Sequence, residues 1–268
     1  MATYLVEGIV LKYFPYRDYD RIFTLYTKEH GKIDAIGRGT GKILSKLVGH
    51  LQPISMSRCM LAEGRRWDVL TQAKALQTYP ILHQNIEALA LAGVAIEAVD
   101  RLTKTGQEEP LVYLALDELF KKLNSKHHQH GTLIYHFLWQ LMTTLGFAPL
   151  VQNCISCKKS LEDTVNETPY FHFQEGGFVC SSCAVEGNFV WPVTPSALHK
   201  LNQYGKESLA VSKSHGTLSS EERGLARLIL HFYQHVIGED ALPKNLLFYR
   251  SIYSSHQPGA QEKSAEKV

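Results

Sequence analysis

The sequence predicts an α+β multidomain protein, in which an N-terminal five-stranded OB-fold barrel precedes an α-helical domain with a four-cysteine zinc-ribbon insertion. Three observations predict this. Strand-like runs separated by turn signals occupy residues 3–77, helical spacing replaces them from residue 84, and two C-x-x-C pairs interrupt the helical part. We expect boundaries at 1–80 for the OB-fold nucleic-acid-binding domain, 81–149 and 190–252 for the helical domain, 150–189 for the zinc-binding insertion and 253–268 for a disordered polar tail.

The barrel is predicted from five β-rich runs. β-Branched and aromatic residues fill these runs, and turn residues such as Gly31 and Gly64 separate them. The runs lie at 6–11, 21–27, 33–37, 52–61 and 66–77. Five strands in about 75 residues are typical of an OB-fold. A small barrel of the SH3 type is the alternative that the sequence leaves open.

Helices are predicted from apolar residues spaced three or four positions apart and from residues that begin and end helices. Gly106 ends the first helical run, Pro110 opens the second, and Gly146 follows a third that starts near Thr132. The polar segment between the second and third helices contains His127, His128 and His130. We expect this segment to be a solvated loop rather than a metal site.

Two further helices are expected after the insertion. Thr194 is an N-cap residue followed by proline, and this helix ends near Gly205. Ser219 and Glu222 form a capping box for the last helix, which ends at Gly238. The apolar faces of these helices predict a packed core rather than a ligand groove.

Two C-x-x-C pairs, separated by twenty-two residues, are the most specific motif in the chain. Two residues between cysteines allow one tight turn to place both sulfurs on the same ion, and two such turns fill a tetrahedral zinc site. We therefore expect structural Zn²⁺ with no open coordination position. Two disulfides or a redox dithiol are the alternatives, and His172 is a competing ligand that we expect to be packed or solvated. The predicted ligands are Cys154, Cys157, Cys180 and Cys183.

Positive charge is concentrated at the N-terminal end. The whole chain has a net charge of only +2, but residues 1–80 hold twelve Lys and Arg against seven Asp and Glu, a net charge of +5. The remaining residues hold sixteen against nineteen, a net charge of −3. This asymmetry indicates an anionic ligand for the barrel.

The cysteine content and the hydrophobic pattern indicate a cytoplasmic protein. Cys59 is left over from the zinc motif, and an unpaired thiol beside a thiolate site fits a reducing compartment. We expect Cys59 to be a packed thiol in a strand. We expect neither a signal peptide nor a membrane span, because no run approaches the ~20 apolar residues that a span requires.

A glycine-rich basic loop is predicted between the third and fourth strands. Segment 37–42 reads Gly-Arg-Gly-Thr-Gly-Lys, but Ile36 stands where a phosphate-binding P-loop needs its first glycine. Ile43 also replaces the Ser or Thr that would hold magnesium. The glycines expose backbone amides beside Arg38, Lys42 and Lys46, which suits a sugar–phosphate backbone.

A second basic loop is predicted at 12–21, between the first two strands. Four aromatic residues alternate there with Lys12, Arg17 and Arg21. In an OB-fold this loop lines the oligonucleotide groove, where bases stack on rings and cations contact phosphates. The alternative is that several of the rings cap the end of the barrel. Arg65 and Arg66, at another turn, extend the basic face.

No motif of an enzyme is present. The chain lacks a G-x-S-x-G elbow, an H-E-x-x-H helix and a glycine fingerprint between a strand and a helix. We therefore expect a protein without catalytic residues.

The order of these features resembles the bacterial recombination mediator family RecO over about residues 3–250. The second half includes a Leu-Gly-Phe-Ala-Pro helix end directly before the cysteine insertion. The matching segments are 8–11, 27–31, 37–39, 51–53, 145–149, 176–180 and the four cysteines. The chain departs from the family in Asp18 and Asp20, where Glu is common, and in a longer glycine segment. Some members lack the cysteines, which implies that the metal has a structural role.

The resemblance implies a DNA-binding mediator of RecF-pathway recombination and DNA repair, close to the bacterial nucleoid. Such proteins bind single- and double-stranded DNA, anneal complementary strands without ATP, and act with RecR to load RecA onto DNA coated with single-stranded DNA-binding protein. The acidic C-terminal tail of that coating protein binds the family's helical domain, where Lys121, Lys122 and Arg227 are candidates. The implied DNA contacts are Lys12, Arg17, Arg21, Arg38, Lys42, Lys46, Arg65 and Arg66.

Two other functions compete with this one. A barrel with a zinc ribbon also suits an RNA-binding module linked to translation or RNA handling, which would prefer RNA and would not accelerate annealing. A zinc-dependent hydrolase is disfavoured, because four cysteines leave no metal position for water.

Overall fold

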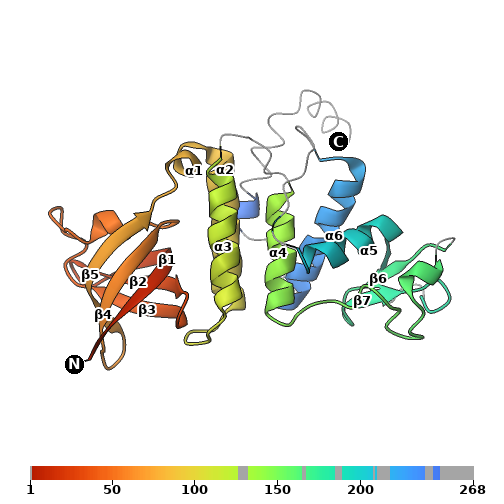
Figure 1. Cartoon of the computed structure of the whole chain (residues 1–268), viewed down its shortest axis with the longest axis horizontal. Helices are drawn as coiled ribbons and strands as arrows, with labels where there is room; N and C mark the ends of the chain where they lie inside the picture. The colour runs from red at the N-terminus through yellow and green to blue at the C-terminus, as the bar shows by residue number, and fades with distance from the viewer. Residues whose placement is uncertain are drawn as a thin grey trace, which may run out of the picture.

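The first five strands close into a barrel in the order β1-β2-β3-β5-β4, the arrangement of an OB-fold (Figure 1). β3 pairs in parallel with β5 and every other pairing is antiparallel, so the predicted OB-fold is confirmed. The strands are β1 Thr3–Tyr16, β2 Asp20–Thr27, β3 Gly31–Gly37, β4 Met56–Ala62 and β5 Asp68–Gln77. The structure is a computed structural model that describes residues 2–125, 132–164, 167–184, 189–207, 209, 218–238 and 244–247.

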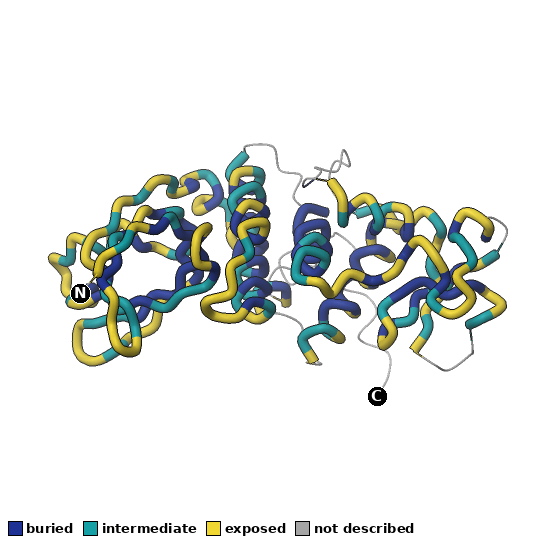
Figure 2. The backbone as a smooth tube through the Cα atoms, turned by 60° about the horizontal axis from the view of Figure 1, so that its bottom comes forward, coloured by how far each residue is buried: buried dark blue, intermediate teal, exposed yellow. Residues whose placement is uncertain are grey.

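Buried apolar residues form a cluster inside the barrel. Figure 2 shows buried backbone around the barrel and exposed backbone in several of its loops. Cys59 lies in this interior, wholly buried, and burial raises the pKa of its thiol to about 12. The expectation of a packed thiol in a strand is confirmed. The buried barrel residues are Val6, Val10, Phe23, Leu25, Ala35, Leu51, Cys59, Leu61 and Leu70.

The segment 12–21 is not the loop that its composition suggested. β1 continues to Tyr16 and β2 begins at Asp20, so the first two strands form a long hairpin with only 17–19 as its turn. Tyr13 pairs with Phe23, and a register shift after Val10 lets the hairpin continue. Aromatic residues favour strands, and this preference outweighed the charges that suggested a loop.

Among the described residues after the barrel, six α-helices have five or more residues. They are α1 Pro80–Gln84, α2 Ile86–Leu102, α3 Pro110–Leu123, α4 Leu133–Thr144, α5 Pro195–Tyr204 and α6 Ser220–Ile237. The first expected helix corresponds to α2, whereas the short α1 before it was not expected. The Asn85 side chain accepts the N–H groups of Glu87 and Ala88 and starts α2 separately from α1. Figure 1 shows α2, α3 and α4 between the barrel and the cysteine-containing segment.

Most predicted helix ends are confirmed, but α2 ends at Leu102 with Thr103 as its C-cap, before the predicted Gly106. Ser219 and Glu222 form the expected capping box, and Gly238 ends α6 with a φ of 68°. Gly146 follows α4 with a φ of 85°, and Gly205 caps α5. The histidines at 127, 128 and 130 and the tail at 253–268 lie outside the described residues.

The barrel packs directly on the helices. Leu11, Tyr26 and Tyr79 of the barrel side belong to the same buried cluster as the helices α2, α3 and α4. Gly31 has a φ of 62°, and a Cβ there would lie 1.9 Å from the carbonyl oxygen of Gln107, so only glycine fits this close approach. One hydrophobic cluster therefore spans the contact between the barrel and the helices, beside the separate cluster inside the barrel.

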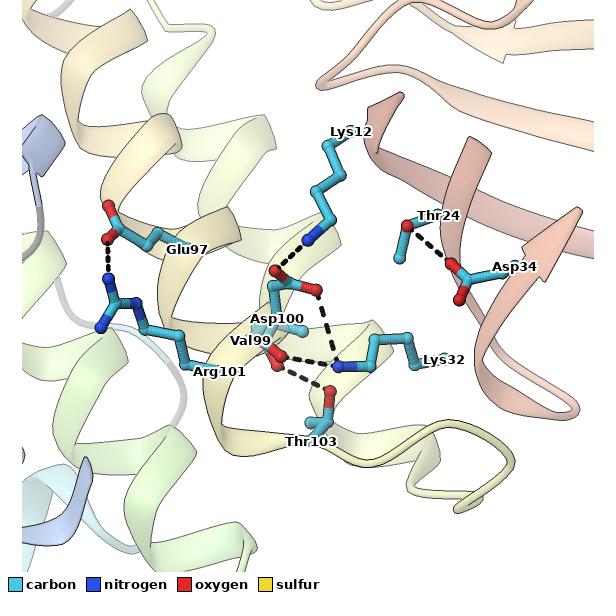
Figure 3. Close-up of polar contacts among 9 residues, drawn as sticks. All are labelled: Lys12, Thr24, Lys32, Asp34, Glu97, Val99, Asp100, Arg101 and Thr103. Carbon is cyan, nitrogen blue, oxygen red and sulfur yellow. Dashed lines mark hydrogen bonds and ion pairs between the residues drawn. The ribbon is translucent and has the colours of Figure 1, made fainter. Parts of the chain in front are cut away.

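Lysines of the barrel also contact the C-terminal end of α2 (Figure 3). Lys12 Nζ lies 2.5 Å from Asp100 Oδ2, and Lys32 Nζ donates a hydrogen bond of 2.6 Å to the Asp100 carbonyl oxygen. A cation beside the last carbonyls of a helix is favourable. These contacts fix the orientation of the barrel against α2.

A small sheet of three strands, ordered β7-β6-β8, follows α4. β6 is Tyr170–His172, β7 is Gly177–Val179 and β8 is Val190–Pro192. The first two were expected from the sequence, whereas β8 was missed because three residues give too short a pattern. Phe171 of β6 packs on Phe232 of α6, with ring centroids 5.8 Å apart, and this contact holds the small sheet against the helical domain.

Candidate nucleic-acid interface and metal centre

The three basic segments singled out in the sequence meet at one end of the barrel. The Tyr16 ring of the β1–β2 hairpin packs edge-on against Trp67 of the β4–β5 turn, with centroids 5.0 Å apart. Gly41 N–H, from the connection between β3 and β4, donates a hydrogen bond of 2.7 Å to the Tyr19 carbonyl. We call this surface, formed by residues 13–21, 38–46 and 65–67, the basic barrel end.

The glycine-rich connection is held firmly at its base. Gly39 N–H donates to Asp20 Oδ1 at 2.8 Å, and the buried Thr40 hydroxyl donates to the Gly37 carbonyl at 2.7 Å. A Cβ on Gly37 would lie 2.7 Å from the Thr40 methyl and 2.8 Å from the Phe23 ring. At this position glycine lets the loop pack against the hairpin, which is a different role from cradling a terminal phosphate.

Four cations of this surface lie over aromatic rings. The distance from the charged group to the ring centroid is 4.6 Å for Arg21 over Tyr13 and 5.2 Å for Arg17 over Tyr16. It is 5.6 Å for Lys42 over Tyr19 and 4.3 Å for Arg66 over Trp67. Such pairs hold a cation and a flat apolar face side by side. Proteins that bind single-stranded nucleic acid use this combination, because cations contact the phosphates and rings stack on unpaired bases.

Rings and cations remain open to solvent at this end. Tyr19 is 56% exposed and Phe14 43% exposed, so part of each side chain is accessible to a ligand. Arg38, Lys46 and Arg65 are exposed as well. Trp67 was missed in the sequence, although its position directly after Arg65-Arg66 is the signal that could have revealed it.

Lys12 lies apart from the other predicted contacts. Its ammonium group points to α2, where it pairs with Asp100 (Figure 3). The other seven predicted cations lie on the basic barrel end: Arg17, Arg21, Arg38, Lys42, Lys46, Arg65 and Arg66.

The four cysteines of the two C-x-x-C pairs form one cluster. Their sulfur atoms all lie within 4.8 Å of one another. The Cys157 and Cys180 sulfurs are 3.6 Å apart, much longer than the ~2.05 Å of a disulfide, and all four cysteines are free. A tetrahedral metal site with metal–sulfur bonds of about 2.3 Å has sulfur–sulfur edges of about 3.8 Å. The cluster has the dimensions to hold a metal ion.

Each cysteine pair is shaped by a tight turn. Lys158 N–H donates to the Cys154 carbonyl at 2.9 Å, and Lys158 itself has a φ of 65°. In the second turn Cys183 N–H donates to the Cys180 carbonyl at 3.0 Å. His172 lies outside the cluster, and its Nδ1 accepts the Glu175 N–H at 3.2 Å.

The ionisation of the thiols also favours a bound cation. Burial opposes ionisation of Cys154, but backbone N–H groups of Cys157, Cys180 and Ser156 outweigh it and lower the pKa to about 6. Hydrogen bonds with the side chains of Cys180 and Cys157 raise the pKa of Cys183 to about 12. Without a cation, ionisation of one thiol therefore makes ionisation of its neighbours less favourable. A divalent cation offsets this repulsion between thiolates, and thiols that coordinate it are deprotonated. The donor set fits such an ion.

The three basic residues proposed for the helical domain differ in their surroundings. Lys121 pairs with Asp117 at 2.6 Å and Lys122 with Glu118 at 3.4 Å, each within α3. Arg227 of α6 lies beside an apolar cleft of about 670 Å³. This cleft is lined by Trp191, Val193, Ala197, Leu225 and Leu228 among others.

These features define an OB-barrel protein with a basic aromatic end, a helical domain and a four-cysteine cluster. Residues 1–79 match the family model described as Recombination protein O N terminal, and residues 83–245 match Recombination protein O C terminal. The chain belongs to the RecO family of DNA repair proteins.

Relatives named DNA repair protein RecO align over most of the chain. The protein of Rubrobacter xylanophilus is 30% identical over 246 residues, covering 90% of this chain and 96% of the relative. That of Synechococcus sp. strain JA-2-3B'a(2-13) is 30% identical over 246 residues, covering 85% of each. That of Desulforudis audaxviator is 32% identical over 183 residues, covering 68% of this chain and 71% of the relative. Among the described helices, none has both the length and the apolar character to cross a bilayer.

Proposed function

We propose that the protein binds single- and double-stranded DNA at the basic barrel end and anneals complementary strands as a mediator of recombinational repair. The observation that carries this proposal is the meeting of three basic segments, with four cation–ring contacts, on one surface of the barrel. Family membership supports a role in DNA repair. The proposed contacts are Arg17, Arg21, Arg38, Lys42, Lys46, Arg65 and Arg66.

Annealing needs no catalytic residue. Two complementary strands repel each other through their phosphates, and cations on a protein reduce this repulsion. Transient stacking on the Tyr and Trp rings keeps bases unpaired with their own strand and available to the other. The basic barrel end offers both kinds of contact, so the proposed activity requires no ATP.

We propose Zn²⁺ as the ion of the cysteine cluster and give it a structural role. Four thiolates are typical of structural zinc and fill its tetrahedral coordination. The ion would hold Cys154, Cys157, Cys180 and Cys183 and fix the two turns that support the small sheet.

Protein partners are proposed for the helical domain. As a mediator the chain would act in the cytoplasm with RecR and help load RecA onto DNA coated with single-stranded DNA-binding protein. Arg227 is the best placed of the three candidates for the acidic tail of that coating protein. It lies beside an apolar cleft, whereas Lys121 and Lys122 are paired with carboxylates of their own helix.

The proposal is tested by binding of fluorescent oligonucleotides over a series of salt concentrations. We expect tight binding of single-stranded DNA, with an affinity that falls steeply with salt because counterions are released from the strand. RNA of the same sequence is the comparison. A clear preference for RNA would contradict the proposal and favour an RNA-binding module.

A further inference from the structure

The tip of the glycine-rich connection presents two large aliphatic side chains to solvent. Ile43 is 100% exposed and Leu44 is 91% exposed, the highest values among the large hydrophobic residues of the described chain. Single exposed apolar residues are ordinary on protein surfaces. Two adjacent ones, both extended away from the protein at a loop tip, are harder to explain by folding alone.

This pair is held out by an anchored loop. The base of the loop is fixed by the hydrogen bonds of Gly39 N–H to Asp20 and of Gly41 N–H to the Tyr19 carbonyl. Next to the tip, Ser45 N–H donates to the Lys42 carbonyl at 3.1 Å and closes a turn around the two aliphatic residues. The turn presents Ile43 and Leu44 as a short apolar projection.

The charges around the projection indicate what it contacts. Arg38, Lys42 and Lys46 are exposed on the same loop, and Lys42 lies over the Tyr19 ring of the neighbouring hairpin. A partner for this surface must be anionic and must also offer flat apolar faces. Nucleic acid meets both requirements, because phosphates surround stacked bases.

We propose that Ile43 and Leu44 insert between adjacent bases of DNA bound at the basic barrel end and unstack that step. Isoleucine and leucine are among the apolar side chains that proteins use as wedges between bases. The inference rests on the proposed DNA binding and assigns the opening of the base stack to one loop tip. Bases separated in this way would be presented to a complementary strand.

The test is the fluorescence of 2-aminopurine placed at successive positions of a single-stranded and a duplex oligonucleotide. This base brightens when it loses its stacking neighbours. We expect severalfold brightening at saturating protein, and loss of this brightening for the double variant Ile43→Ser, Leu44→Ser. The salt dependence of binding should stay unchanged, since no cation is removed.

The matched control is Leu5→Ser, which removes a 53%-exposed leucine from β1 outside the basic barrel end and should brighten the probe as fully as the unmodified protein does. DNA bound without brightening, or equal brightening by the double variant, would overturn the wedge while leaving DNA binding intact. Absence of any DNA binding by the unmodified protein would overturn the proposed function itself. Binding to anionic phospholipid vesicles that the double variant loses, with an unchanged DNA response, would assign the two residues to a membrane surface instead.

Discussion

The cysteine cluster and the basic barrel end are both built from turns, but they are completed differently. Four sulfurs within 4.8 Å of one another form a closed donor set, and an ion placed there has no free position. The basic barrel end leaves rings such as Tyr19 and cations such as Arg38 open to solvent. The comparison teaches that the first site has the form of a closed metal site, for which we propose a structural role, whereas the second is open to a ligand.

The largest effect is expected from breaking the closed site. Cys157→Ser should abolish stoichiometric zinc and unfold much of 150–189, because metal binding of about 10–16 kcal/mol in small zinc domains is also their folding energy. Metal analysis and hydrogen exchange measure the two results. Cys59→Ala is the control, since this buried barrel thiol lies outside the cluster and its loss should leave the zinc content unchanged.

The pH dependence of zinc retention sharpens the same contrast. Zinc ligands must be thiolates, so protons compete with the ion and affinity falls as the pH falls. The metal-free pKa of Cys183 is raised to about 12, which makes this competition strong at neutral pH. Competition with a chelator should therefore remove zinc more readily at pH 6 than at pH 8. Equal retention at both values would contradict an all-thiolate site.

A smaller effect is expected where the basic barrel end depends on one ring. Trp67→Ala removes the contacts with Tyr16 and Arg66, and we expect single-stranded DNA to bind more weakly by about 1–3 kcal/mol. Titration by fluorescence anisotropy measures this. Trp191→Ala in the small sheet is the matched control, because that tryptophan is 40% exposed but remote from the barrel loops. Equal losses in both variants would contradict a role specific to Trp67.

Removing two cations tests the electrostatic part of the surface. For Arg38→Ala with Lys42→Ala, the slope of log affinity against log salt on single strands should become shallower by about 0.7 for each lost contact. Lys121→Ala with Lys122→Ala removes the same charge from α3 and should leave the slope unchanged. If the first pair also leaves it unchanged, the glycine-rich loop does not contact DNA.

The smallest effect is expected for Lys12. Its partly exposed ion pair with Asp100 should contribute about 0–1 kcal/mol to stability, and its loss should not alter the salt slope. Thermal melting of Lys12→Ala, Asp100→Ala and the double variant gives the pair energy. If Lys12→Ala instead makes the salt slope shallower by the amount of one phosphate contact, Lys12 contacts DNA, as the sequence predicted.

The two regions also differ in how far the sequence reveals them. The cysteine cluster is encoded largely by local spacing, since each C-x-x-C pair forms its own turn. The pairs then meet through contacts such as that between the Cys157 and Cys180 sulfurs. The basic barrel end depends on which loops a closed barrel brings together. Each of its three segments is recognisable in the sequence, but the contact between Tyr16 and Trp67 follows from strand order and register, which no local pattern contains.

Tyr13 and Lys12 show the physical reason. The charges around Tyr13 suggest a loop, yet its ring pairs across the hairpin with Phe23, and cross-strand packing decides the local structure. Composition groups Lys12 with its basic neighbours, yet it pairs with Asp100, eighty-eight positions later in the chain. Charge composition alone does not give the direction in which a side chain points from a strand.

The most direct test is the annealing of two complementary oligonucleotides coated with single-stranded DNA-binding protein, without ATP. We predict that the zinc-loaded protein accelerates annealing and that the Arg38→Ala, Lys42→Ala variant accelerates it less, while Lys121→Ala, Lys122→Ala changes it only if α3 contacts the coating protein. Failure of the folded, zinc-loaded protein to accelerate annealing would contradict the assignment of the basic barrel end to strand annealing.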